Sequence, residues 1–126
     1  MDDRERYEQG MKIRREVLGN AHVDHATQSA SDFTAPFQDL ITRYAWAEVW
    51  SRPGLSRHTR SLLTLAMTVA LNREEEFRLH LPAALNNGVT REEIRELLIH
   101  SAIYCGVPAA NHAFKIAAEI LGSNSR

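Results

Sequence analysis

The chain has little cysteine and little net charge. Cys105 is its one cysteine in 126 residues, and the formal net charge is −1. A single cysteine excludes an internal disulfide and a two-cysteine redox centre within one chain. A net charge near zero provides no overall field that would favour nucleic acid or an anionic membrane. We therefore expect neither of these partners.

Long apolar segments are also missing. The longest apolar runs, such as residues 61–71, are too short to span a bilayer, which takes about 20 residues. The first ten residues, MDDRERYEQG, are charged and contain no apolar signal segment. The hydrophobic content of 44% and charged content of 25% are ordinary for a globular protein. We expect one cytoplasmic domain, residues 1–126, around a single core.

Strand-like alternation is scarce, whereas helical spacing of apolar residues occurs almost everywhere. The sequence therefore predicts an all-α bundle of about six helices. Thr90 followed by Glu93 forms a capping box that marks the start of the fifth helix. Residues 20–33 lack periodicity and are predicted to form a loop. The predicted helices cover approximately residues 3–18, 34–50, 57–72, 73–86, 91–104 and 108–121.

Several helices have a predicted inner face. The third helix, residues 57–72, is so apolar that burial on most sides is expected. Trp46 and Trp50 are expected to anchor a core or an interface rather than to stack on a ligand. The stripe of the first helix consists of Tyr7, Met11, either Arg14 or Arg15, and Leu18. That of the second consists of Phe37, Leu40, Ile41, Tyr44 and Ala45.

His80 is the first candidate for chemistry. It lies beside the apolar stripe of its helix, at the edge of the core, where a pocket or a subunit interface could reach it. Spacing alone favours a partly buried structural histidine, although a side chain with a pKa near 6.5 is a natural proton carrier. The stripe consists of Phe77, Leu81, Ala84 and Leu85.

The second candidate is the basic segment RPGLSRHTR. It contains Arg52, Arg57, His58 and Arg60, the last three in the first turn of a predicted helix. Positive charge is unfavourable there against the helix dipole. A cationic helix N-terminus suits an anionic ligand, because free backbone N–H groups add to the side-chain charge. A solvated basic turn paired with nearby carboxylates is the alternative, and spacing leaves both open.

Other candidates are weaker. Tyr104 and Asn111 flank the CGVPAA turn and could hydrogen-bond a substrate carboxylate or stabilise the turn. Glu92 and Glu93 are explained by the start of a helix. The six histidines show no metal-binding spacing, and no glycine-rich phosphate loop is present. We predict no metal site.

Three segments together resemble the carboxymuconolactone decarboxylase family. They are RYEQGMKIRREVLGNAHVD (6–24), ITRYAWAEVWSRPGLSRHTRSLLTLAM (41–67) and FRLHLPAALNNGVTREEIRELLIHSAIYCGVPAAN (77–111). The resemblance covers nearly the whole chain, in order and without large gaps. It implies an alkylhydroperoxidase-like, all-helical fold with a central two-helix hairpin. It also implies a homo-oligomer, with a hexamer expected.

The resemblance further implies a reaction, the decarboxylation of 4-carboxymuconolactone to 3-oxoadipate enol-lactone without cofactor or metal. That step belongs to the protocatechuate branch of the β-ketoadipate pathway. His80 stands at the position of the superfamily's helix histidine. It would hydrogen-bond the lactone carbonyl or return the proton. The implied substrate-binding residues are Arg57, His58 and Arg60 for the carboxylates and Tyr104 and Asn111 for the far wall.

The sequence departs from the family pattern at two places. Arg73 and Glu76 stand where the peroxidase branch has a Cys-x-x-Cys pair, so thiol peroxidase chemistry is not expected. Pro82 stands where the family commonly has an arginine, and a proline inside a helix costs about 3 kcal/mol or a kink. Two alternatives follow, a non-catalytic oligomeric binding protein on the same scaffold and a decarboxylase or isomerase of a related lactone.

Overall fold

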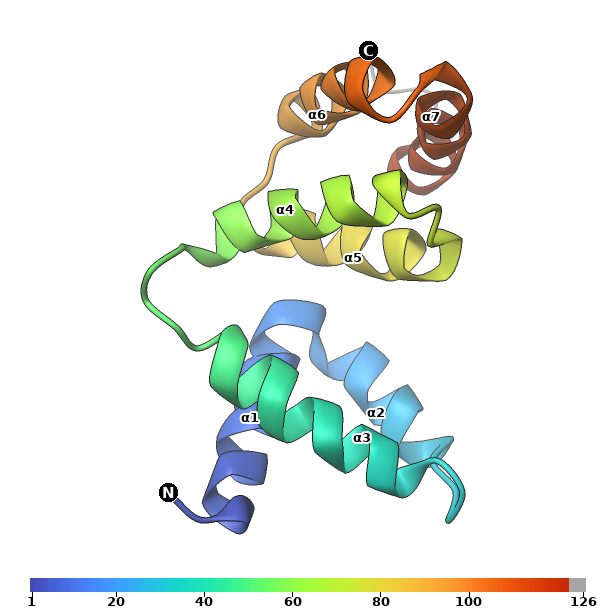
Figure 1. Cartoon of the computed structure of the whole chain (residues 1–126). Coiled ribbons are helices and arrows are strands. Elements are labelled where there is room, and N and C mark those ends of the chain that lie inside the picture. Colours follow the sequence, from blue (N-terminus) through green and yellow to red (C-terminus); the bar gives the residue numbers. More distant parts are fainter. Residues whose placement is uncertain (123–126) are drawn as a thin grey trace. The chain divides into compact units, whose positions relative to one another are not determined.

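The computed structural model describes residues 1–122, which form helices joined by short turns, without strands in that range (Figure 1). The all-α prediction is confirmed, with seven α-helices in the described part of the chain where about six were expected. None of these helices is long and apolar enough to cross a membrane. The elements are α1 (Asp3–Leu18), α2 (Asn20–Gln28), α3 (Ala35–Ile41), the π-helix η1 (Thr42–Val49), α4 (Arg57–Ala70), α5 (Glu74–Asn86), α6 (Arg91–Tyr104) and α7 (Val107–Leu121).

The chain forms two compact units, Met1–Arg57 and a second that begins at His58. Each has its own core. In the first unit, Ile13, Val17 and Trp46 form a core cluster, and Val23 and Ala47 are also buried. The core of the second consists of Leu65, Val69, Phe77, Leu81, Ala84, Val89, Ile94, Leu98, Ala113, Ile116 and Ala117.

In the first unit, α1 and η1 approach each other closely at Gly10. A Cβ atom at this glycine would overlap the backbone carbonyl of Thr42. The glycine is therefore required by the packing. The predicted stripe of α1 is displaced, since Tyr7, Met11 and Leu18 are only partly buried. The buried residues are Gly10, Ile13, Arg14 and Val17, so of the two arginines left open by spacing, Arg14 is the buried one.

The loop predicted over residues 20–33 is wrong for its first part, because Asn20–Gln28 forms α2. Gly19, with φ of 95°, separates α2 from α1. Val23 is the one fully buried residue of α2. A nine-residue helix with a single buried position produces no detectable apolar period.

The predicted inner face of residues 35–49 is confirmed only in part, because Ile41 and Ala45 are partly buried but the other three residues are exposed. Phe37 is 60% exposed, Leu40 45% and Tyr44 47%. The second half of this segment is a π-helix, in which each N–H bonds five residues back, whereas the prediction assumed 3.6 residues per turn. The wider turn changes which residues face α1. The residues that are buried instead are Thr42, Trp46 and Ala47.

Trp46 and Trp50 meet within the first unit, with ring centroids 5.3 Å apart. Trp46 is buried in the core and Trp50 packs against it. The prediction that these tryptophans anchor a core is confirmed.

In the second unit, α4 and α5 form an antiparallel hairpin (Figure 1). Asn87 Nδ2 donates a hydrogen bond to Ser61 Oγ at 3.0 Å, which ties the end of α5 to the beginning of α4. The α7 helix packs on both α5 and α6. Its small buried residues Ala110, Ala113 and Ala117 allow that close approach.

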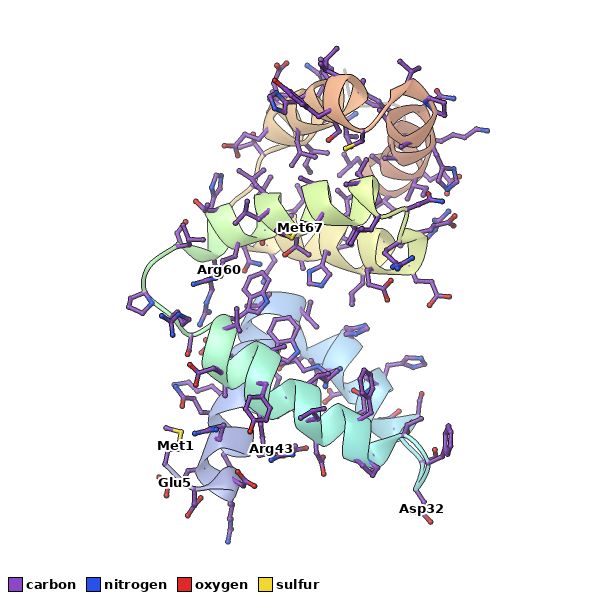
Figure 2. All side chains as sticks on the ribbon, in the orientation of Figure 1. Met1, Glu5, Asp32, Arg43, Arg60 and Met67 are labelled. Carbon is purple, nitrogen blue, oxygen red and sulfur yellow. The ribbon has the colours of Figure 1, made fainter. Side chains whose placement is uncertain are left out.

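The prediction that α4 is buried on most sides is wrong for a single copy of the chain. Leu65 and Val69 are buried, whereas Leu63 is 41% exposed, Met67 59% and Leu71 62% (Met67 is labelled in Figure 2). These three exposed residues recur every fourth position, so they form a second apolar stripe along the helix.

The α5 helix runs without interruption through Pro82, whose ring is exposed. Proline has no N–H, so the carbonyl of Arg78 lacks its usual helical donor, at a cost of about 3 kcal/mol. Burial of Phe77, Leu81 and Ala84 on the opposite face offsets this cost, since each fully buried large apolar side chain contributes about 1.5–3 kcal/mol.

Candidate functional site

His80 lies on α5 at the boundary between the core and the surface. Its neighbour Leu81 is fully buried, His80 itself is half-buried, and Glu76, one turn earlier, is exposed. The core-edge position predicted from spacing is confirmed. A half-buried imidazole retains access to a ligand while packing restricts its orientation, which suits a proton carrier.

The first turn of α4 packs against the link between α5 and α6. His58 Nε2 lies 2.9 and 3.0 Å from the two carboxylate oxygens of Glu93. Glu93 also accepts a hydrogen bond from the backbone N–H of Thr90 at 2.8 Å and completes the predicted capping box of α6. The hydrogen bond from His58, followed by that from Thr90, lowers the pKa of Glu93.

Arg57 and His58 both have carboxylate partners. The Arg57 guanidinium lies 2.9 Å from Glu16 of α1, within the first unit. These two partners partly neutralise the basic turn, as in the alternative of a paired surface turn. Arg60 follows on the same turn of α4, half-buried (Figure 2). Its predicted contact with a substrate carboxylate stays a prediction, as for Arg57 and His58.

The hairpin brings the basic turn and His80 onto one pair of helices. Ser61, the neighbour of Arg60, is bonded to Asn87. Asn87 follows His80 by seven residues, so the two levels are roughly 10 Å apart along the helix axis. A small substrate and an extended arginine side chain can span that separation.

Tyr104 and Asn111 are exposed within the chain. Tyr104 is 78% exposed, and its ring lies 4.9 Å from that of His100. Asn111 lies on the first turns of α7 with its side chain at the surface. In the single chain neither residue forms an enclosing wall, so their predicted contact with substrate stays a prediction.

A cavity of about 630 Å³ lies between α4 and α6. Its walls are largely apolar, from Leu62, Leu63 and Leu97, but Glu92, Glu93 and Glu96 also line it. Several carboxylates in one lining repel an anionic ligand, so this cavity is a poor site for a substrate with two carboxylates.

No three histidine, cysteine or acidic side chains within residues 1–122 are close enough to hold a metal ion. Two residues of interest were not singled out from the sequence. Glu93 was assigned to the helix start alone, because its contact with His58 joins positions 35 apart in the chain. Arg14 could not be distinguished from Arg15 by spacing.

The sequence of the chain is similar to those of known proteins. The sequence profile of the carboxymuconolactone decarboxylase family matches residues 35–119. The chain is 52% identical to 4-carboxymuconolactone decarboxylase of Acinetobacter baylyi over 120 aligned residues. The aligned region covers 95% of this chain and 90% of that protein.

Two further relatives are similar. Nitrosuccinic acid decarboxylase npaB of Metarhizium robertsii is 48% identical over 107 residues, 85% of this chain and 75% of that protein. A 4-carboxymuconolactone decarboxylase sequence of Pseudomonas putida is 51% identical over 45 residues, 36% of this chain and 94% of that sequence.

Proposed function

The chain belongs to the carboxymuconolactone decarboxylase family, and from this premise we propose that it is a carboxy-lyase converting 4-carboxymuconolactone into 3-oxoadipate enol-lactone. The observation that carries the proposal is the 52% identity, over 95% of the chain, to a relative named for decarboxylating that compound. The reaction belongs to the protocatechuate branch of the β-ketoadipate pathway. A cytoplasmic location is part of the proposal.

The chemistry requires few groups from the protein. The leaving carboxylate is on a saturated ring carbon that adjoins the double bond conjugated with the lactone carbonyl. When the bond to that carboxylate breaks, CO₂ leaves and the electron pair moves through the double bond onto the carbonyl oxygen. A proton then returns to a ring carbon and the carbonyl re-forms. Because the ring accepts the electrons, the proposed reaction needs no cofactor or metal.

The residues of α4 and α5 are assigned accordingly. His80 either hydrogen-bonds the developing oxyanion or delivers the returning proton, both of which lower the barrier. Arg57, His58 and Arg60 bind the substrate carboxylates, and Arg57 and His58 also have carboxylate partners in Glu16 and Glu93. Tyr104 and Asn111 contribute to the far wall.

We further propose that the protein is a homo-oligomer, with a hexamer expected. The apolar stripe of Leu63 and Met67 on α4, continued by Leu71 just after its end, supports this, because contiguous exposed apolar residues are typical of protein interfaces. Native mass spectrometry tests the assembly, and a monomer at micromolar concentration would contradict it.

The assay generates the lactone in situ and follows its ultraviolet absorbance together with CO₂ release. We expect turnover with and without a chelator. An absence of turnover would favour a non-catalytic binding protein, and loss of turnover on chelation would contradict the metal-free mechanism.

His80→Ala is expected to lower kcat by about 10²- to 10⁴-fold, the range typical of a lost general acid or base. His112→Ala is the matched control, since His112 lies on the same unit, exposed and paired with Glu74. A folded His80→Ala protein with near-wild-type kcat would refute the assignment of His80.

A second candidate activity is the decarboxylation of nitrosuccinic acid, favoured by the relative named for it. Nitrosuccinic acid also carries a carboxylate beside an electron-withdrawing group, in this case a nitro group, so the same demands apply. Parallel assays give kcat/KM for both acids. A higher value for nitrosuccinic acid would make this the preferred function.

A further inference from the structure

The first unit contains a cavity of about 210 Å³. Residues of α1, α2, α3 and η1 line it, so it lies entirely within Met1–Arg57. Its polar lining includes Tyr7, Arg14, Thr27, Gln38 and Thr42. None of these residues has a part in the proposed decarboxylation.

Arg14 is the central group of this cavity. Its side chain is buried, at 7% exposure. Nη1 donates to Thr42 Oγ1 at 3.4 Å and Nη2 donates to Gln38 Oε1 at 3.2 Å, so both acceptors are neutral. The Nε atom is buried and has no hydrogen-bond partner within residues 1–122.

A buried cation that faces only neutral acceptors is energetically unfavourable, because it has lost its hydration without gaining an opposite charge. Burial lowers the pKa of Arg14, as expected for a charge in this position. The neighbouring Arg15 has the usual arrangement, with its guanidinium at the surface 2.8 Å from Asp24. The contrast shows that the buried position of Arg14 is not shared by the next arginine on the helix.

Two other ionisable groups face this region. Burial and then the positive charge of Arg14 lower the pKa of His22, so the field of the guanidinium extends beyond its own hydrogen bonds. Asp39 lines the cavity and is exposed, but it forms no ion pair with Arg14 among the contacts of residues 1–122. The guanidinium of Arg14 therefore has no carboxylate partner among the contacts of residues 1–122.

We propose that this cavity binds the carboxylate of a small organic acid, with Arg14 as the counter-ion. A guanidinium matches the planar, two-oxygen shape of a carboxylate better than it matches a spherical anion. Tyr7, Thr27 and the Gln38 amide supply further donors. The volume corresponds to roughly seven water molecules at about 30 Å³ each, which suits acids from acetate to a four-carbon dicarboxylate.

The test measures binding of succinate, acetate and inorganic phosphate to the full-length protein, with sodium chloride at equal ionic strength as reference. Both tryptophans lie in the first unit, and Trp46 packs on Ile13 and Val17, which flank Arg14 on α1. Tryptophan fluorescence, and a thermal midpoint followed by that fluorescence, therefore report on this unit. We expect saturable responses to the two carboxylates beyond that of chloride.

Arg14→Met removes the charge while keeping an unbranched side chain, and should weaken carboxylate binding by roughly tenfold or more, as for a lost charge-assisted hydrogen bond. Without added acid, its thermal midpoint should be equal to or above that of the wild type, since an unpaired buried charge is removed. Arg15→Met is the matched control and should bind like the wild type.

Two results would overturn the proposal. One is wild-type protein that shows no saturable response to succinate or acetate beyond chloride. The other is equal affinity in Arg14→Met and wild type. Tighter binding of phosphate than of either carboxylate would overturn the assigned ligand class. If Arg14→Met does not fold, Arg14→Lys replaces it, and is expected to retain weakened binding because the charge remains without the planar fork.

Discussion

The two units of the chain are stabilised in different ways. The second unit buries eleven apolar residues in one cluster, and its buried polar groups are hydroxyls such as those of Thr68 and Ser101, which bond to nearby carbonyls. The first unit has a cluster of three buried apolar residues, with Val23 and Ala47 also buried, and it buries the charged Arg14. Burial of apolar area dominates the second unit, whereas the first depends on close backbone approach and on how one charge is accommodated.

Gly10→Ala gives the largest expected effect on stability. The added Cβ would overlap the Thr42 carbonyl, and backbone atoms of two helices cannot yield as a flexible side chain would. Overpacking of this kind costs about 1–3 kcal/mol or more. Urea unfolding of the variant measures it.

Gly54→Ala is the control in the same unit, because nothing lies within 4 Å of a Cβ added there. Equal stability of the two alanine variants would show that the first unit does not depend on this close approach.

An identical substitution in each unit sharpens the comparison further. Ile94→Val in the second unit and Ile13→Val in the first each remove one methylene group from a buried side chain, at a typical cost of 0.5–1.5 kcal/mol. The cost should be greater for Ile94, at 1% exposure in the large cluster, than for Ile13, at 6% in the small one. Denaturant midpoints measured side by side decide this, and the reverse order would break the comparison.

The smallest expected effect concerns a surface charge of the second unit. This charge is the carboxylate of Glu93. The hydrogen bond from His58 lowers the pKa of Glu93 in the folded state, so the folded state favours the ionised carboxylate. This contribution to stability is present above the ordinary pKa of about 4.5 and is lost as the pH falls through the lower, folded value. Glu93→Gln removes the charge but keeps a side chain that completes a capping box.

The thermal midpoint of Glu93→Gln should lie slightly below that of the wild type near pH 7, and the two should converge as the pH falls through the lowered pKa and the wild-type carboxylate protonates. Glu92→Gln, in the same first turn, should show a smaller difference because Glu92 is exposed. A difference for Glu93→Gln that persists at pH values below the lowered pKa of the carboxylate would contradict the assigned role of its hydrogen bond with His58.

Much of the fold was predictable because it depends on local spacing. The helix of residues 3–18, the capping box at Thr90 and the core-edge position of His80 all follow from side chains one turn apart. The α2 helix and the register of η1 were not predictable in this way. One has a single buried residue, and the other replaces the regular turn by a wider one.

The sequence by itself determined the all-helical class, the two helices that carry His80 and Arg60, and, through resemblance, the reaction to be tested. Only the tertiary structure decided that His58 binds Glu93 and that Arg14 rather than Arg15 is buried beside a cavity. The physical reason is separation along the chain. Helical periodicity depends on neighbours three or four residues apart, whereas these contacts join residues 24 to 35 positions apart.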